Sequence, residues 1–215
     1  MKERTDDTGY RYEDAANSHA HAYLLPTLKA ELAILREDLP PRQPTLFDLG
    51  CGNGSVGAQL ASDGWSVTGV DPSTEGISEA QRAYPCLRFE QGSAYDDLAV
   101  KYGRFPVVIS LEVVEHVYAP RDYARTLFDL VEPGGTAIVS TPYHGYLKNV
   151  ALALSGNMDR HFTALWDHGH IKFWSVPTLT TLLSEAGFES IRFRRVGRVP
   201  QLAKSMIAIA RKPAG

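Results

Sequence analysis

The amino-acid sequence predicts an α/β fold: a doubly wound, mostly parallel sheet with helices on both faces. Three observations lead to this prediction. Short apolar runs alternate with segments of helical periodicity along most of the chain. A glycine-rich loop follows the first apolar run, at residues 50–57. The last two apolar runs are separated by only a short loop, so we expect them to pair in an antiparallel hairpin.

Length and composition indicate a single domain over residues 1–215. The chain has 215 residues, of which 44% are hydrophobic and 22% charged, as in a globular protein that can bury a full core. A formal net charge of -3 provides no general positive field, so no nucleic-acid partner is expected. The two cysteines, Cys51 and Cys86, suggest no disulfide framework. We expect a cytoplasmic protein, because neither an apolar leader nor a transmembrane segment is visible.

The N-terminal half is expected to contain a helical segment at 10–39 and three strands. The helical segment places apolar residues at helical spacing: Leu25, Leu28, Leu32 and Leu35. Pro40 and Pro41 then end the helix. Short apolar runs predict strands over 45–49, 65–70 and 87–90. A helix over 55–61 follows the first strand, and Ser73 is expected to cap the helix after the second.

The C-terminal half is expected to supply the centre of the sheet and its closing hairpin. The continuous apolar run at 106–111 is typical of a strand covered on both faces. The next helix begins at Pro120 and carries one apolar face: Tyr123, Leu127, Leu130 and Val131. A strand over 136–140 follows. A helix between Ser175 and Gly187 then leads to the last two strands, 188–196 and 205–210.

Residues 142–173 interrupt this alternation and are too long for a simple connection. We therefore expect an insertion that serves as a lid and contains its own helix, with one apolar face: Leu147, Val150, Ala151 and Leu154. Lys148 and Asn149 beside this face make a weak contact with a membrane surface conceivable.

The glycine-rich loop and two carboxylates indicate a cofactor site. Without Cβ atoms, Gly50, Gly52 and Gly54 let backbone N–H groups approach a ligand closely. Asp48 ends the first strand, where its charge disfavours a pyrophosphate and suits an ammonium or sulfonium group. Asp71 ends the second strand, where it can accept hydrogen bonds from ribose hydroxyls. The glycine spacing also fits a dinucleotide-binding domain, so an NAD-binding oxidoreductase is the rival hypothesis.

These residues, together with the run 109–117 and the turn 132–135, resemble the class I S-adenosylmethionine-dependent methyltransferases. The resemblance covers roughly residues 40–212 and implies a Rossmann-like, seven-stranded sheet whose last strand is antiparallel. It also implies S-adenosyl-L-methionine as methyl donor and S-adenosyl-L-homocysteine as product. Ser93 departs from the pattern, because the family often carries an acid there that contacts the adenine. The implied cofactor-binding residues are Asp48, Gly50, Cys51, Gly52, Gly54, Asp71, Pro72, Ser93, Ala94 and Leu111.

Histidines and aromatic residues indicate where the methyl acceptor binds. Four of the seven histidines lie between Thr141 and Phe173, among aromatic residues suited to a pocket with titratable groups. The run 112–117, together with 168–173, is similar to the ubiquinone-pathway O-methyltransferases. That similarity implies a phenolic acceptor and an apolar groove. His116 is the first candidate for a general base, and His170 the second.

No metal site is expected. Glu112, Glu115 and His116 could hold a divalent cation, but three residues so close in sequence seldom converge without a distant ligand. His168 and His170 lack the companion spacing of a zinc site. A basic cluster near the C-terminus is interpreted as the solvated face of an edge strand: Arg192, Arg194, Arg195 and Arg198.

The sequence therefore predicts a methyltransferase that modifies a hydroxyl of a small aromatic or lipid-like molecule. Three alternatives stay open: N-methylation of a sugar or another small metabolite, an NAD-binding oxidoreductase, and a non-catalytic sensor of the cofactor. Asp48 argues against the oxidoreductase, and a sensor would not need a histidine-rich acceptor cavity. The oligomeric state cannot be predicted from these observations.

Overall fold

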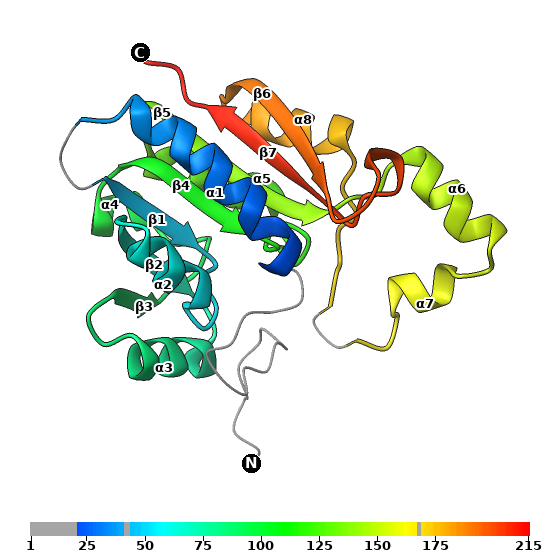
Figure 1. The fold of residues 1–215 in the computed structure, drawn as a ribbon, viewed down its shortest axis with the longest axis horizontal. Helices are drawn as coiled ribbons and strands as arrows, with labels where there is room; N and C mark the ends of the chain where they lie inside the picture. Colours follow the sequence, from blue (N-terminus) through cyan, green and yellow to red (C-terminus); the bar gives the residue numbers. More distant parts are fainter. Residues whose placement is uncertain (1–20, 41–43, 167–168) are drawn as a thin grey trace.

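The computed structural model describes residues 21–40, 44–166 and 169–215 (Figure 1). Part of the predicted N-terminal helical segment, residues 10–20, lies outside the described residues. Within the described part, the predicted helix is present as α1 (His21–Glu37).

Seven strands form one twisted sheet in the order β3-β2-β1-β4-β5-β7-β6. Strands β1 to β5 run parallel to one another, whereas β7 is antiparallel to both β5 and β6. The predicted sheet and its closing hairpin are thereby confirmed. The strands are β1 (Thr45–Leu49), β2 (Ser66–Asp71), β3 (Arg88–Gln91), β4 (Phe105–Leu111), β5 (Val131–Pro142), β6 (Glu189–Val196) and β7 (Ser205–Arg211).

The register brings the functional strand ends to one edge of the sheet. Asp48 of β1 is level with Gly69 of β2 and with Ile109 of β4. The chain runs outward from β1 to β3 and then returns to the other side of β1 as β4. In open parallel sheets, ligands bind at such a reversal of strand order, beyond the carboxyl ends of the strands.

Helices cover both faces of the sheet (Figure 1). On one face, α1 and α2 pack on Val107 and Ile109 of β4, and on the opposite face α4, α5 and α8 pack on Val108. This alternation explains why β4 is apolar at every position except Ser110, whose hydroxyl donates a hydrogen bond to Leu49 O. Besides α1, the helices that flank the sheet are α2 (Ser55–Ser62), α3 (Thr74–Ala83), α4 (Leu98–Tyr102), α5 (Pro120–Leu130) and α8 (Val176–Glu185).

At two of these helices, the serine that the sequence places before the first turn acts as the N-cap residue. The Ser73 side chain accepts a hydrogen bond from Gly76 N at the start of α3, and Ser175 forms a capping box with Thr178 at the start of α8. Each cap satisfies a backbone N–H that the first turn of a helix leaves without a partner.

One local prediction is wrong, and one predicted helix has an unexpected environment. Val131 does not extend the apolar face of α5 but begins β5, with φ -80° and ψ 134°. Pro133 explains this, because proline cannot continue a helix and favours extended backbone before it. In the insertion, α6 (Tyr146–Leu154) forms as predicted, but its apolar face is not packed: Leu147 and Leu154 are 57% and 85% exposed. The buried residue of α6 is Lys148.

The structure also contains short elements that the sequence did not indicate: α4, α7 (Met158–Phe162) and the 3-10 helix η1 (Pro200–Leu202). All are at most five residues long, too short to establish a helical period. Among the described residues, no helix combines the length and apolar character needed to cross a membrane.

The basic cluster on β6 is only partly a solvated face. Arg192 and Arg194 both form ion pairs with Glu31, a buried residue of α1. The two guanidinium groups lower the pKa of Glu31, with the Arg192 hydrogen bond as the largest cause. Because Glu31 is 161 residues from Arg192 in sequence, this contact fastens the first described helix to the edge strand.

Candidate functional site

The glycine loop between β1 and α2 forms a tight turn against β2. Gly50 N and Cys51 N both donate hydrogen bonds to Val70 O, at 2.8 and 3.1 Å. Gly50 has φ 86°, and a Cβ added to it would lie 2.3 Å from Val113 Cγ2. Gly54 has φ 74°, a backbone conformation that L side chains rarely adopt. The loop therefore needs these glycines for its conformation and for close packing.

Asp71 shapes this loop in addition to its predicted role. Asp71 Oδ2 accepts a hydrogen bond from Gly52 N at 2.9 Å, and Oδ1 accepts one from Ser73 N at 2.8 Å. Each carboxylate oxygen can accept more than one hydrogen bond, so these two contacts are compatible with the predicted contact to ribose hydroxyls. The Asp-Pro-Ser sequence after β2 is typical of a turn in which the side chain bonds to the backbone, which was the available signal for this role.

Asp48 is a buried carboxylate that lacks compensation. Its side chain is 2% exposed, and Oδ2 has no hydrogen-bond partner among the described residues. Burial, and then the negative charge of Asp71, raise the pKa of Asp48 to about 7. Burying an unpaired charge is costly, so a cationic ligand group placed here would be strongly favoured. The role of Asp48 as the acceptor for an ammonium group stays a prediction.

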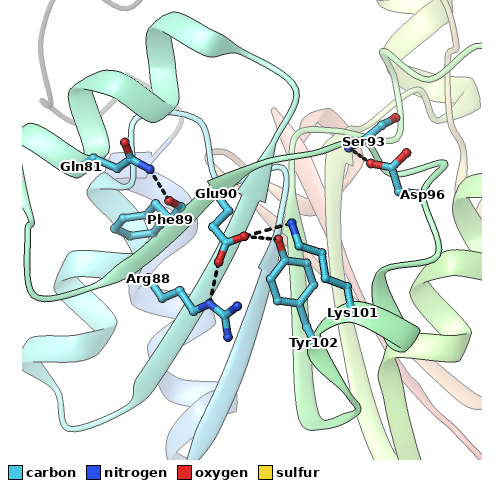
Figure 2. A network of polar contacts seen from close by, with 8 residues as sticks. All are labelled: Gln81, Arg88, Phe89, Glu90, Ser93, Asp96, Lys101 and Tyr102. Carbon is cyan, nitrogen blue, oxygen red and sulfur yellow. Dashed lines mark hydrogen bonds and ion pairs between the residues drawn. The ribbon is translucent and has the colours of Figure 1, made fainter.

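The turn after β3 is held by its own polar contacts (Figure 2). Ser93 N donates to Asp96 Oδ2 at 2.7 Å, and Ser93 Oγ accepts from Tyr95 N at 3.2 Å. Ser93 replaces the acid that the family resemblance leads us to expect, and Asp96 places a carboxylate beside it. Ala94 packs against the core, and Pro72 is exposed next to Asp71. The contacts of Pro72, Ser93 and Ala94 with an adenine ring remain predictions.

Glu90 anchors β3 to α4 beside this turn (Figure 2). Its carboxylate accepts hydrogen bonds from Arg88 Nε at 2.8 Å and from Tyr102 Oη at 2.9 Å, and it pairs with Lys101. The Arg88 and Lys101 hydrogen bonds lower the pKa of Glu90 to about 2. These contacts fix the position of the short edge strand β3 beside the candidate cofactor site at the carboxyl ends of β1 and β2.

A second group of polar residues lies where β4 ends, directly after Leu111. Glu112 has φ 55°, unusual for a residue with a side chain, and its carboxylate accepts from Ser140 Oγ at 2.8 Å and Ser205 Oγ at 3.2 Å. Tyr23 of α1 is hydrogen-bonded to the same Ser205 hydroxyl at 3.2 Å. Burial raises the pKa of Glu112 to about 7 despite these hydrogen bonds. From the sequence, Glu112 was interpreted only as a possible metal ligand, and no pattern in the sequence indicated this hydrogen-bond network.

The structure brings together the two predicted base candidates. The rings of His116 and His170 lie 4.9 Å apart between centroids, with an interplanar angle of 71°. Ile171 N and Lys172 N donate to the backbone oxygen of Glu115 at 2.9 and 3.0 Å, which holds the end of the insertion against the loop after β4. Burial, and then the positive charge of His116, lower the pKa of His170 to about 4.

Glu115 completes a group of residues that could hold a metal ion. It is 1% exposed, and neither carboxylate oxygen has a hydrogen-bond partner among the described residues. Ligand atoms of Glu115, His116 and His170 lie within 4.8 Å of one another. The sequence argument against a metal rested on the lack of a distant ligand, and His170 supplies one. His168, the other histidine considered there, lies outside the described residues.

Comparison with known proteins identifies the family. A family model described as a methyltransferase domain matches residues 12–192. This chain belongs to the methyltransferase-domain family. Curated relatives include the ubiquinone biosynthesis O-methyltransferase of Azorhizobium caulinodans, 36% identical over 152 residues, which are 67% of this chain and 58% of the relative. The protein of the same name from Methylobacterium nodulans is 32% identical over 163 residues, 73% of this chain and 64% of the relative.

This methyltransferase domain thus spans less than two thirds of the length of those relatives. Among solved structures, magnesium protoporphyrin IX methyltransferase from Synechocystis PCC 6803 with bound SAH aligns with a TM-score of 0.64 and 22% identity, over 87% of this chain and 82% of that one. The similarity confirms the predicted fold. The predicted resemblance to S-adenosylmethionine-dependent methyltransferases, including the ubiquinone-pathway branch, is confirmed at the level of the family.

The methyltransferase domain has a cavity of about 660 Å³ between the insertion and the loop that joins β6 to β7. His144, His161, His170 and Phe173 line it, as expected from the histidine-rich sequence of the insertion. Other aromatic residues of that stretch do not: Tyr143 and Trp174 belong to the hydrophobic core. The sequence could not separate these two sets, because aromatic side chains serve equally in cores and in pockets.

Proposed function

We propose that this methyltransferase domain transfers a methyl group from S-adenosylmethionine to a hydroxyl of a small aromatic or lipid-like molecule. The observation that carries the donor assignment is the buried carboxylate of Asp48 beside the glycine loop, whose Oδ2 has no hydrogen-bond partner among the described residues. The names of the curated relatives, ubiquinone biosynthesis O-methyltransferases, favour oxygen as the methylated atom over the nitrogen of a sugar or another metabolite.

The residues around the loop fit each part of the donor. Asp48 would bind the ammonium group and Asp71 the ribose, while the backbone of residues 50–54 would line the methionine portion. Pro72, Ser93 and Ala94 would flank the adenine, and Leu111 would contribute its backbone at the end of β4. When bound, the donor supplies an electrophilic methyl group on a sulfonium.

The remaining work of the protein is to position the acceptor, exclude water and remove one proton. His116 would accept the proton from the acceptor hydroxyl, because it follows β4 immediately after the proposed donor edge. The nearby carboxylates of Glu112 and Glu115 would stabilise the imidazolium that forms. His170, with its lowered pKa, is a weak base and would orient the His116 ring.

A divalent cation held by Glu115, His116 and His170 is a second way to activate the hydroxyl, favoured by the proximity of their ligand atoms. Such an ion lowers the pKa of a hydroxyl bound to it. Turnover measured before and after chelation of divalent cations distinguishes activation by a bound cation from activation by His116 as the base. Loss on chelation with recovery on adding Mg²⁺ or Zn²⁺ favours the cation, and unchanged turnover favours His116 as the base.

Equilibrium binding of S-adenosylmethionine, S-adenosylhomocysteine and NAD to wild type and Asp71→Ala tests the donor assignment. We expect the first two compounds to bind wild type and to bind Asp71→Ala more weakly. Binding of NAD without binding of the sulfonium would identify an oxidoreductase instead. Binding of the donor without methyl transfer to any hydroxyl-bearing acceptor would favour the sensor hypothesis. A lid role for residues 142–173 and a cytoplasmic location remain predictions.

A further inference from the structure

The cavity beside the proposed base is lined by positive charge. Four cationic side chains from three parts of the chain line it: Lys148 of α6, Arg160 of α7, and Arg198 and Lys204 of the β6–β7 loop. Among the described residues that line the cavity, there is no aspartate or glutamate. The formal net charge of the whole chain is -3, so this concentration of cations is local and does not reflect overall composition.

These cations lack counter-ions. Within the described parts of the chain, none of the four forms an ion pair, although eight ion pairs occur elsewhere. Lys204 instead lies over the ring of Tyr23, with its Nζ 5.1 Å from the centroid. Surface cations are satisfied by water, but a cavity lined by like charges without carboxylates is unfavourable unless an anion occupies it.

Of the four cationic side chains that line the cavity, Lys148 has the least access to water. It is 8% exposed, and the hydrogen bond from its Nζ to the backbone oxygen of Lys204 is long, at 3.4 Å. Burial, and then the positive charge of Arg198, lower the pKa of Lys148 to about 8. Glu112 attracts this ammonium, but both of its carboxylate oxygens already accept hydrogen bonds from serines. An ammonium has three donors, so Lys148 retains capacity to bind an anion.

The cavity leads to the proposed site of methyl transfer. His170 lines it, and the His170 ring lies 4.9 Å from the ring of His116, which is not itself a lining residue. Pro142 also lines it and ends β5, whose neighbour β4 leads directly into Glu112 and His116. A molecule in the cavity could therefore place a hydroxyl beside this pair of histidines while its other end reaches the cationic residues.

We propose that this cavity is the acceptor site and that it selects an acceptor bearing an anionic group, a carboxylate or a phosphate, bound by Lys148 with Arg160 and Arg198. This inference rests on the proposed methyl transfer and narrows its substrate class. Apolar residues also line the cavity, among them Ala151, Leu152, Phe173 and Leu202, so the inference adds an anionic group to the phenolic acceptor with an apolar groove that the sequence resemblance implies.

A phospholipid headgroup carries the same phosphate as a soluble acceptor, and α6 exposes Tyr146, Leu147 and Leu154. We assign the site to an acceptor that enters the cavity because Lys148, the cation with the poorest compensation, is buried. A membrane surface would be met by exposed cations, whereas a buried one requires the anion to come inside.

The test measures binding of two probes that differ by one charge, 3,4-dihydroxybenzoate and its neutral amide, 3,4-dihydroxybenzamide. Calorimetry is carried out on the full chain with and without saturating S-adenosylhomocysteine. We expect the benzoate to bind about 10–100-fold more tightly than the amide, as a charge-assisted contact allows. Lys148→Met and Arg198→Gln should each remove most of that preference. Arg125→Gln on α5, which alters an exposed arginine outside the cavity lining, should leave it unchanged.

Several results would overturn the inference. Equal affinity for the two probes, no binding of either, or a preference that survives both cavity variants each excludes an anion-selective acceptor site. Retention on phosphatidylglycerol vesicles but not on phosphatidylcholine vesicles, lost in Lys148→Met and without benzoate binding, would assign the cations to a lipid surface. Methionine is close to lysine in length and apolar, so Lys148→Met should stay folded, and unchanged affinity for S-adenosylhomocysteine verifies this.

The donor measurement separates this inference from the proposed function. If S-adenosylmethionine binds and the benzoate shows no preference over the amide, only the anionic acceptor is refuted. If the benzoate preference is present but the donor does not bind, the methyltransferase proposal fails while the anion site stands.

Discussion

Asp48→Asn is expected to stabilise the ligand-free protein at alkaline pH and to weaken binding of the methyl donor. Burial and Asp71 raise the pKa of Asp48 from its ordinary value of 3.8 to about 7. The folded state therefore holds this proton more tightly than the unfolded chain, so stability falls as pH rises through that interval and stops falling above about pH 7. At about 1.4 kcal/mol per pKa unit, the full loss is about 4 kcal/mol.

Urea unfolding of the wild type and Asp48→Asn without ligand, at pH 5 and at pH 8, measures this effect. At pH 5 only part of the loss has developed, about 1.5 kcal/mol, so the advantage of the variant should grow by about 2–3 kcal/mol between the two conditions. Glu112 and Glu115 also have raised pKa values, but they are present in both proteins and cancel in the comparison. Calorimetry at pH 8 should show about 10–100-fold weaker binding of S-adenosylmethionine to the variant, because its ammonium loses a charged partner.

The two readouts must move in opposite directions. A stability difference that is the same at both pH values would show that Asp48 is not ionised against a cost in the folded protein. Unchanged affinity for S-adenosylmethionine would show that the Asp48 carboxylate does not contact the ammonium group of the donor. The donor assignment would then lose its main structural support.

Three further predictions concern other parts of the site and fold. His116→Gln should lower turnover by about 10²–10⁴-fold with little change in donor affinity, since a general base acts only on the acceptor proton; steady-state kinetics with unaltered turnover would remove it from the mechanism. Gly50→Ala should destabilise the protein by about 1–3 kcal/mol in thermal unfolding, because the new methyl group meets Val113. Gly103→Ala is the matched control, since φ is 82° there but no atom lies within 4 Å, and equal losses would refute the steric argument. Glu31→Gln should cost about 1–3 kcal/mol in urea unfolding by weakening the contacts of α1 with β6, and an unchanged midpoint would show that α1 is held by apolar packing alone.

The arrangement of the sheet could be predicted because local signals agreed along the chain. The apolar run of β4, the glycine loop after β1 and the caps at Ser73 and Ser175 each specify one element independently of tertiary contacts. The exposure of the apolar face of α6 could not be predicted, because helical periodicity shows which residues share a face but not what that face contacts. In the structure that helix turns Lys148 inward, toward the cavity.

The proximity of the candidate cofactor residues could be predicted for a topological reason, and the proximity of the candidate acceptor residues could not. Asp48 and Asp71 end adjacent parallel strands, so connectivity alone brings them to one edge of the sheet. His170 reaches His116 only because the backbone at Ile171 and Lys172 bonds to Glu115, and neither spacing nor composition encodes that contact. The charge of the cavity depends on side chains from α6, α7 and the β6–β7 loop, which come together only in three dimensions.

The position of β7 has a consequence for how the chain folds during synthesis. In the described sheet, β6 has no neighbour other than β7, and β7 follows β6 in the chain. Until β7 is synthesised, β5 presents an open edge, and the arginines that link α1 to β6 have no sheet to hold them in place. The growing polypeptide therefore closes α1 and the β6–β7 hairpin onto the sheet in one late step, and a nascent chain interrupted before Ser205 would have an exposed edge prone to misassembly.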